Sequence, residues 1–539
     1  MAGARNAGAR NAGARSAAAR RAILSVALVF ALAAGAVNLS SLITGLGRSS
    51  LTSPEATVLF EDRNGVFLSD RPNADDTYGY WEIGGELPSR IVKCVVASED
   101  RRFYRHPGID PTAIVRALLH NTGHKSVQGA STIAMQVARL QTPAPRTVRN
   151  KIVEMYAAFF MVVRHGRDGV LRHYLRIAPQ GNQMQGFAYS ARRYFRKPLD
   201  DLSWAEAALL TSLIRSPGRL NLFDYSGFLR ARRRADLILS LLYKDGTLDS
   251  EQYRVSLVHL SSISYQRKEN RPENSYHYIF RLLDSYQQPE VSSPSRPVRV
   301  SLDTEIQDYL QAMADRAMES FRPFGAGNTA LMVVDRKNGD VLGYIGSQSY
   351  FDEAYKGSIN YAATPRSTGS TLKPFLFALG LQSNNFTPAS VLADLPFHVL
   401  SPSGEYTAGN FDGEYLGPML YRRALANSRN IPPLRVLESI GLQATYQFFQ
   451  SLGLSDASKP VEHYGYGLVI GGLYSSLEQI LTAYGVLAND GKAFDLRWVA
   501  PTQTSTDRPP AKHLISESAA RQVSLFLSDP LSRLPTFPR

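Results

Sequence analysis

The segment 98–139 constrains the possible fold of this chain more than any other stretch. An apolar run, residues 94–97, should be buried, and the acid Glu99 follows where that run ends. Asp110 and Pro111 then form the pattern of a helix start, with Asp as the N-cap and Pro in the first turn, and apolar residues follow at helical spacing. Glu99 is therefore predicted to lie at the rim of a core between two helices, where a carboxyl group can act as a base.

Two motifs in this segment resemble the first two motifs of the family 51 peptidoglycan glycosyltransferases. The first consists of Glu99, Asp100, Arg101, Phe103, His106, Gly108 and Asp110, and the second of Gly129, Ser131, Thr132, Ile133 and Gln136. The family's third motif, a basic pair followed by Glu, matches at Lys151 and Glu154, while Asn150 stands where the family has Arg. The resemblance implies an all-α, lysozyme-like glycosyltransferase domain, expected over residues 55–225.

The chemistry implied by this resemblance is the polymerisation of lipid II, an undecaprenyl diphosphate-linked disaccharide-peptide, into glycan strands. In such enzymes the acid at Glu99 takes a proton from the acceptor sugar's 4-hydroxyl, whose oxygen attacks the anomeric carbon of the growing chain with inversion. The leaving group is a lipid diphosphate, so Lys151 and Arg139 are predicted to bind its phosphates. Glu154, the second predicted catalytic acid, should lie near those phosphates or hold one of the cations. The remaining predicted substrate-binding residues of this domain are Ser131, Thr132 and Gln136.

No cofactor is required for this chemistry, although a divalent cation such as Mg²⁺ could help to neutralise the diphosphate. The sequence shows no dedicated metal site. His106 and His124 are too isolated in the sequence to be predicted as metal ligands. The formal net charge is +13, and five arginines precede residue 22; without them the chain still has 55 basic and 47 acidic residues, a net charge of +8. This remaining charge suits an anionic membrane surface and a diphosphate substrate. Nucleic acid is the competing explanation of this charge, and no nucleic-acid-binding motif supports it.

The N-terminal residues predict a membrane anchor. Residues 1–21 are a basic, low-complexity segment without acids and are expected to form a cytoplasmic tail. Residues 22–44 are expected to form a single transmembrane signal-anchor, although the continuous apolar run is short for a bilayer core of about 30 Å. A cleaved signal peptide is the alternative, because residues 34–36 could serve as a cleavage site. We prefer the uncleaved anchor, which places the catalytic domains on the periplasmic side of the bacterial inner membrane.

The middle of the chain is expected to be helical. The stretch 178–187 and the residues after it resemble the C-type subgroup of class A penicillin-binding proteins, except that Arg172 and Arg176 replace a Glu and an Asn of the family. Residues 226–297 are predicted to be a linker whose basic run, 230–234, forms a solvated helix face. The single cysteine, Cys94, excludes an intramolecular disulfide and should be a small buried apolar residue.

A second domain is expected over residues 298–539. Two apolar strands are predicted on either side of Asn338-Gly339, which is a strong hairpin signal. Ser370 and Lys373 then form a Ser-x-x-Lys pair, which on a helix puts the hydroxyl and the amine on one face, where a neutral Lys can take the proton of the serine. Such a pair taken alone is a weak signal.

The neighbourhood of this pair resembles the transpeptidase domain of class A penicillin-binding proteins. The matching stretches are 365–367, 374–375, 410–413 and 428–430. The resemblance implies that Ser370 is the acylated nucleophile and Lys373 its base, and that Ser428 and Asn430 relay protons and contact substrate. Penicillin is then an expected ligand.

One motif of that domain is missing. Lys-Thr-Gly on an inner strand should come after a helix predicted over residues 476–487, and the sequence does not contain it. We therefore expect a truncated α/β (α+β) transpeptidase domain that lacks its C-terminal strands and exposes a new sheet edge. Acylation by penicillin is predicted to be weak or lost.

Three functions remain open from the sequence. The first is a fully bifunctional glycosyltransferase and DD-transpeptidase. The second, which we prefer, is a glycan-strand polymerase with an impaired transpeptidase domain. The third is a non-catalytic cell-wall scaffold, which Asn150, Arg172 and Arg176 make conceivable. Lipid II, nascent glycan strands and other cell-wall synthesis proteins are the expected partners.

Overall fold

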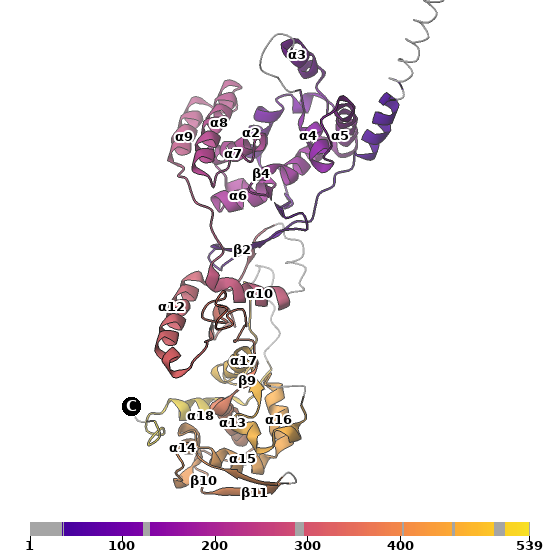
Figure 1. Ribbon diagram of the computed structural model, residues 1–539. Helices are drawn as coiled ribbons and strands as arrows, with labels where there is room; N and C mark the ends of the chain where they lie inside the picture. The colour runs from indigo at the N-terminus through magenta and orange to yellow at the C-terminus, as the bar shows by residue number, and fades with distance from the viewer. Residues whose placement is uncertain are drawn as a thin grey trace, which may run out of the picture. The chain divides into compact units, whose positions relative to one another are not determined.

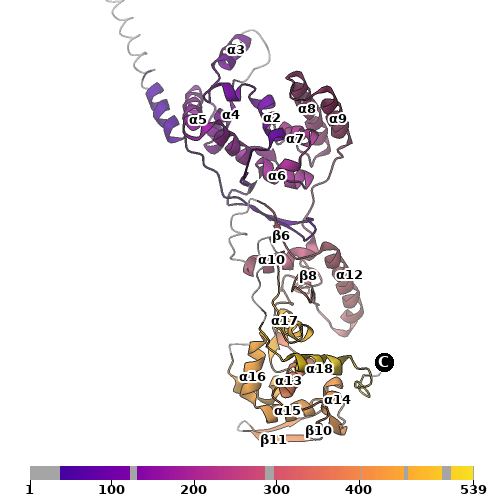
Figure 2. The ribbon, with the colours of Figure 1, turned by 180° about the vertical axis from the view of Figure 1, so that it is seen from behind.

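The computed structural model describes residues 35, 37–121, 130–285, 296–401, 404–454, 459–500 and 512–537. Within these residues the chain forms two compact units (Figures 1 and 2). Unit 1 contains the residues up to 59, residues 70–269 and residues 296–297. Unit 2 contains residues 60–69, residues from 270 to 285 and the chain from 298 onward. The predicted linker 226–297 thus contributes helices to both units.

Unit 1 is built mainly of helices. They are α2 (Ser89–Glu99), α3 (Pro111–Asn121), α4 (Ile133–Gln141), α5 (Val148–Ile177), α6 (Phe187–Phe195), α7 (Trp204–Ser212), α8 (Tyr225–Lys244) and α9 (Ser250–Ser262). Side-chain caps start several of them, as at Asp110, where Oδ1 accepts from the backbone N–H of Ala113, and at Ser203, which forms a capping box with Glu206. Both of these helix starts were predicted from the sequence.

The centre of unit 1 is α7, whose residues from Ala205 to Ser212 are all buried. A helix that is mostly apolar all round belongs in the interior of a domain, and Glu206, its one acid, is paired with Lys197. α7 packs against α2, α8 and α9, while α4 packs along α5. Cys94 on α2 is fully buried, as expected. This packing holds the C-terminal end of α2, where Glu99 lies, against the side of α8.

A small sheet interrupts the helices and corrects the expectation of an all-α domain. Its strands are β3 (Tyr78–Gly79), β4 (Pro179–Gly181) and β5 (Met184–Gln185), in the order β3-β5-β4. β3 pairs with β5 in parallel, and β4 pairs with β5 in antiparallel orientation. Strands of two or three residues are too short to produce a periodic sequence signal.

Residues 37–47 form a helix that packs on α5. A Cβ atom at Gly45 would come 2.5 Å from the Cβ of Tyr156, so the two helices approach closely at this glycine. Tyr156 Oη also donates a hydrogen bond of 2.8 Å to Asn38 Oδ1. Among the described residues, no helix is both long enough and apolar enough to span a bilayer. Most of the predicted span 22–44 lies outside the described residues.

Unit 2 begins with strands contributed by distant parts of the chain. β1 (Val58–Glu61) lies between β2 (Phe67–Arg71) and β6 (Val298–Arg299), and it pairs with β6 in parallel. α10 (Tyr276–Ser285) follows unit 1 in sequence, and α12 (Thr304–Phe321) packs against β8. β7 (Leu331–Val334) and β8 (Val341–Ile345) form an antiparallel hairpin. The hairpin predicted around Asn338-Gly339 is therefore confirmed.

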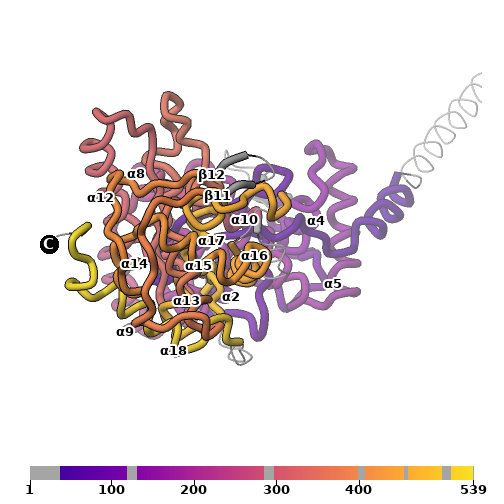
Figure 3. The backbone as a smooth tube through the Cα atoms, turned by 90° about the horizontal axis from the view of Figure 1, so that it is seen from below, coloured from indigo at the N-terminus to yellow at the C-terminus, as the bar shows by residue number. Residues whose placement is uncertain are grey.

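The rest of unit 2 is a helical cluster with short two-stranded sheets. The helices are α13 (Lys373–Gln382), α14 (Tyr421–Ala426), α15 (Ile431–Ile440), α16 (Leu442–Ser451), α17 (Leu477–Ala488) and α18 (Glu517–Ser528). The strand pairs are β9 (Arg366–Ser367) with β14 (Tyr474–Ser475), β10 (Val391–Asp394) with β13 (Gly417–Leu420), and β11 (Phe397–Ser401) with β12 (Gly404–Ala408). α13 lies among α14, α15, α16 and α18 (Figure 3) and packs against each of them. Most of its side chains are buried. The interior of this cluster therefore surrounds the helix that starts at Lys373.

Candidate active site

Glu99 is the last residue of α2, and both of its carboxylate oxygens have partners within unit 1. Oε1 accepts a hydrogen bond of 2.9 Å from Ser98 Oγ, and Oε2 accepts one of 3.2 Å from Gln136 Nε2 on α4. Tyr174 Oη on α5 donates to Gln136 Oε1 at 3.0 Å, which turns the amide nitrogen of Gln136 toward Glu99. Burial, and then the charge of Glu99, raises the pKa of Tyr174 well above its ordinary value, so this phenol remains a donor.

Arg234 on α8 is a residue of this site that the sequence analysis missed. Its Nη2 lies 3.8 Å from Glu99 Oε1 and donates to Ser98 Oγ at 3.3 Å. Its side chain is only 23% exposed, so the prediction of a solvated face for 230–234 is wrong at this position. The sequence does place apolar residues three before and four after Arg234, and these two, Ala231 and Ile238, are buried. That spacing could have placed Arg234 on the buried side of the helix, but it could not identify Glu99 as its partner.

The other polar residues of the first motif, together with Thr132 of the second, hold the segment together. The Asp100 carboxylate is bonded to His106 Nε2 at 3.0 Å and accepts from the backbone N–H of Ile133 at 3.1 Å, at the start of α4. His106 Nδ1 accepts from the Gly108 N–H at 3.2 Å, so Nε2 carries the proton shared with Asp100. Thr132 caps α4 and donates to the Gly108 carbonyl at 2.6 Å. Thr132 is 2% exposed, so its hydroxyl belongs to this scaffold.

A second cluster of predicted residues forms around Lys151. Its Nζ donates to Ser131 Oγ and to Glu154 Oε2, each at 2.8 Å. The ammonium group remains partly open to solvent, since the Lys151 side chain is 41% exposed. Of the two positions expected for Glu154, the structure therefore shows the one in which it holds a cation. Arg139 lies in the last turn of α4, and its charge acts on Tyr174.

The residues that depart from the family pattern have local structural roles. Asn150 Nδ2 donates to the Pro145 carbonyl at 2.9 Å, which supports the start of α5. Arg172 donates to the carbonyls of residues 83 and 85, the second at 2.8 Å. Arg176 Nε donates to the Tyr80 carbonyl at 2.9 Å. The two arginines thus hold the segment 80–85 against α5 by its backbone.

In unit 2, Lys373 lies at the start of α13 and is 1% exposed. Its Nζ donates to the Ser428 carbonyl at 2.7 Å and to Asn430 Oδ1 at 2.8 Å, and lies 3.5 Å from Ser428 Oγ. Burial, and then the charge of Arg429, lowers the pKa of Lys373 to about 7. Ser370 precedes it in the turn Gly369–Leu372 and lines, with Lys373 and Ser428, a cavity of about 530 Å³. The structure thus brings these four predicted residues together.

Arg429, between Ser428 and Asn430, anchors this part of the site through buried charges. Its Nε lies 2.9 Å from Oδ2 of Asp394, which is fully buried, and its Nη1 lies 2.7 Å from Asp412 Oδ2. Asn410 Nδ2 donates to Asp394 Oδ1 at 2.7 Å, and Asn410 Oδ1 accepts from the Asn430 N–H at 2.8 Å. The segment 410–412 therefore sets the position of the Asn430 backbone.

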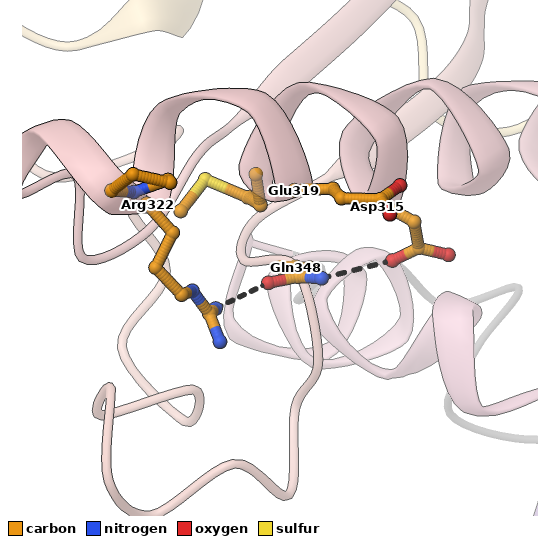
Figure 4. A pocket seen from close by; sticks show the side chains of 6 residues that line it. Asp315, Glu319, Arg322 and Gln348 are labelled. Carbon is orange, nitrogen blue, oxygen red and sulfur yellow. Dashed lines mark hydrogen bonds between the residues drawn. The ribbon is translucent and has the colours of Figure 1, made fainter.

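Unit 2 has a second hollow, of about 470 Å³, beside the C-terminal end of α12. Figure 4 shows that Gln348 connects two of the polar side chains that line it: it accepts from Arg322 at 2.6 Å and donates to Asp315 at 3.2 Å. The Arg322 guanidinium also lies 3.9 Å from the centre of the Tyr355 ring. This hollow contains none of the predicted catalytic residues. In the described part of the chain, no group of three or more His, Cys, Asp or Glu side chains could hold a metal ion.

Comparison with known families finds one match over the candidate site of unit 1 and another over the candidate site of unit 2. Residues 75–242 match the transglycosylase family model, and residues 329–529 match the model of the penicillin-binding protein transpeptidase domain. The two matches occur in this order and together cover more than half of the chain. The chain belongs to the class A penicillin-binding proteins. The first match contains Glu99, Lys151 and Arg234, and the second contains Ser370 and Lys373.

Two curated relatives of this class A protein show how far the similarity extends. Penicillin-binding protein 1C of Escherichia coli K12 is 29% identical over 494 residues, which are 90% of this chain and 60% of the relative. Penicillin-binding protein 1B of Vibrio cholerae is 27% identical over 420 residues, 76% of this chain and 53% of the relative. The chain therefore spans little more than half the length of these relatives. A crystal structure of penicillin-binding protein 1A from Haemophilus influenzae aligns with 88% of this chain and 79% of its own, with a TM-score of 0.46 and 16% identity.

Proposed function

We propose that this protein is a peptidoglycan glycosyltransferase that polymerises lipid II into glycan strands. The observation that carries the proposal is the carboxylate of Glu99, which is held at both oxygens within the part of the chain that matches the transglycosylase model. Oε2 accepts one hydrogen bond, from Gln136, and so keeps a further lone pair with which to accept a proton. Glu99 would remove the proton of the acceptor 4-hydroxyl, and that oxygen would displace the lipid diphosphate from the anomeric carbon with inversion.

The cluster around Lys151 supports a role in binding the leaving diphosphate. Its ammonium group is held by Ser131 and Glu154 and is still partly open to solvent, so phosphate oxygens can reach it. Arg139 would add a second cation from the adjacent helix. A divalent cation such as Mg²⁺ would neutralise part of the diphosphate charge if one binds with the substrate. The proton transfer assigned to Glu99 uses no metal ligand.

A membrane-bound substrate requires a site beside the bilayer, and one surface of unit 1 supports this location. The helix 37–47 and the neighbouring part of α5 carry exposed apolar side chains. These are Val37, Leu39, Ile43, Leu46, Phe159 and Val163. A surface of this kind fits the interfacial region of a membrane. We propose that it faces the outer leaflet of the inner membrane, below a signal-anchor formed by the preceding residues.

A polymerisation assay tests the glycosyltransferase function. Purified protein is incubated with fluorescent lipid II, and the products are separated by size. Wild type should form polymer, and Glu99→Gln should form none, because the amide cannot accept the proton. Glu86→Gln replaces an exposed acid in the same unit and should behave as wild type. A folded wild-type protein that forms no polymer would support the non-catalytic scaffold instead.

A second candidate function is acyl transfer at Ser370, and the observation that favours it is the buried amine of Lys373. With a pKa of about 7, a substantial fraction of this amine is neutral at physiological pH and can accept the proton of Ser370. The Ser428 carbonyl and Asn430 Oδ1 both accept hydrogen bonds from this amine. This candidate would make the protein a bifunctional glycosyltransferase and DD-transpeptidase, with penicillin as a ligand of unit 2.

Labelling with fluorescent penicillin decides between an active transpeptidase site and the impaired one expected from the sequence. Robust labelling that disappears in Ser370→Ala would establish acylation at this serine. Ser383→Ala, at the opposite end of α13, should label as wild type does. Absence of labelling in folded wild type would support a glycosyltransferase with an impaired second domain. Other cell-wall synthesis proteins remain proposed partners, to be identified by crosslinking in cells.

A further inference from the structure

We propose that Arg234 is a positioning residue for Glu99, which fixes the orientation of the carboxylate toward the acceptor hydroxyl. The inference rests on the proposed glycosyltransferase function and adds a residue to that site. Arg234 lies on α8 and Glu99 ends α2, and these two helices pack against each other. The contact joins positions far apart in the sequence, so tertiary packing alone creates it.

The guanidinium group reaches the carboxylate both directly and through Ser98. Its Nη2 is 3.8 Å from Glu99 Oε1 and 3.3 Å from Ser98 Oγ, and Ser98 Oγ in turn donates to Glu99 Oε1 at 2.9 Å. The serine hydroxyl donates its one proton to Glu99, and the Arg234 donor satisfies its lone pair. Loss of Arg234 would therefore remove both the ion pair at Oε1 and one of the two hydrogen bonds that fix the Ser98 hydroxyl.

The opposite oxygen is held from a different direction. Gln136 donates to Oε2, and Tyr174 fixes the Gln136 amide. With Oε1 held from α8 and Oε2 held from α4, the carboxylate cannot turn about its last side-chain bond. Because general-base catalysis depends on the position of the accepting lone pair, a displacement of about 1 Å can reduce the rate by about 100-fold.

Several features indicate that arginine at this position has a specific task. The Arg234 side chain is largely buried, and burial lowers the pKa of its guanidinium. Its Nε is also buried and has no hydrogen-bond partner among the described residues. A desolvated cation with an unused donor is unfavourable to the fold in itself. By contrast, its neighbour Arg233 on the same helix is exposed.

A role in binding substrate phosphate is the competing explanation, because the charge of Arg215 also acts on Arg234 and the two could form an anion site. The contact with Glu99 argues against it. A phosphate bound at Arg234 would lie beside the carboxylate and be repelled by it. The two roles also differ kinetically, since loss of a phosphate contact weakens substrate binding and raises KM, whereas a misplaced base lowers kcat.

The test is steady-state polymerisation of fluorescent lipid II by the full chain, with variants checked for folding by circular dichroism. Arg234→Ala should reduce kcat about 10- to 100-fold and change KM by less than about threefold. Added guanidinium ion should restore part of the activity of Arg234→Ala and should not increase that of wild type. Arg234→Lys should retain more activity than Arg234→Ala, because it keeps the charge without the planar fork. Arg233→Met is the matched control and should match wild type.

These measurements distinguish a failure of the role of Arg234 from a failure of the proposed glycosyltransferase function. An unchanged kcat in Arg234→Ala, or a rise in KM alone, would overturn the positioning role while wild type still makes polymer and Glu99→Gln does not. Failure of guanidinium to rescue a folded Arg234→Ala would also count against it, since a purely structural loss is not repaired by a small cation. If folded wild type makes no polymer, the proposed function fails, and the role of Arg234 fails with it.

Discussion

The buried amine of Lys373 should make unit 2 less stable at neutral and acidic pH than at alkaline pH. Its pKa falls from 10.5 to about 7 on folding. Above pH 10.5 the amine is neutral in both states. As the pH falls from 10.5 to 7, the unfolded chain gains a proton that the folded chain does not, so stability declines, and below pH 7 the full difference is present. At about 1.4 kcal/mol for each pH unit, this difference amounts to about 5 kcal/mol below pH 7 and about 2 kcal/mol at pH 9.

Lys373→Met removes this destabilisation and therefore isolates its size. The variant also loses the hydrogen bonds from Nζ to the Ser428 carbonyl and to Asn430 Oδ1, each worth about 1 kcal/mol. The net expectation is that Lys373→Met is more stable than wild type by about 3 kcal/mol at pH 6 and about equally stable at pH 9. Lys373 would then be a residue that the proposed acyl transfer requires but that lowers the unfolding free energy of unit 2.

Hydrogen exchange measured by mass spectrometry can follow unit 2 in the full chain. Peptides from α13 and α15 report the opening free energy of its core, and comparison with wild type at the same pH cancels the intrinsic exchange rate. Lys337→Met, which replaces an exposed lysine of unit 2, should show no such pH dependence. The reasoning is refuted if the difference between Lys373→Met and wild type is the same at pH 6 and pH 9, or if the variant is less stable at pH 6.

Three further outcomes are expected. Arg429→Met leaves the fully buried Asp394 unpaired, so it should reduce the unfolding free energy of unit 2 by about 3 to 5 kcal/mol, measured by denaturant titration; a loss below about 1 kcal/mol would contradict the role of the ion pair. Tyr174→Phe removes the donor that orients Gln136 and should slow lipid II polymerisation by about tenfold, with the rate unchanged if the amide orientation is irrelevant. Gly108→Val should destabilise unit 1 in thermal melts, because its φ is +95° and a Cβ there would come 2.4 Å from a backbone carbonyl of α5; a melting curve like that of wild type would show that the segment can shift.

Features determined by local chemistry could be predicted from the sequence. The helix starts at Asp110 and Ser203 and the hairpin at Asn338-Gly339 depend on residues within a few positions of one another. The residue pair Ser370 and Lys373 was likewise visible as a motif. In each case one short segment contains all the information that the structure uses.

Other features depend on packing between distant segments, and the sequence alone did not reveal them. Arg234 reaches Glu99 only because α8 packs on α2, so its basic neighbours suggested a solvated face. Asp394, the partner of Arg429, is the last residue of β10 and lies 35 positions earlier in the sequence. The lowered pKa of Lys373 arises from burial, which a motif does not specify. Tertiary environment, rather than residue identity, sets each of these properties.

Residues 60–69 belong to unit 2 although they precede most of unit 1 in the sequence, and this order should affect how the chain folds during synthesis. The carboxylate of Asp62 accepts hydrogen bonds from the Thr304 backbone N–H at 3.2 Å and from its hydroxyl at 2.8 Å, and β1 pairs with β6. All residues of unit 1 from 70 to 269 leave the ribosome between these partners. Unit 1 can therefore form its core before residues 298–304, the partners of residues 60–69, have been synthesised. We expect the pairing of these two distant segments in unit 2 to be a late and slow step of folding.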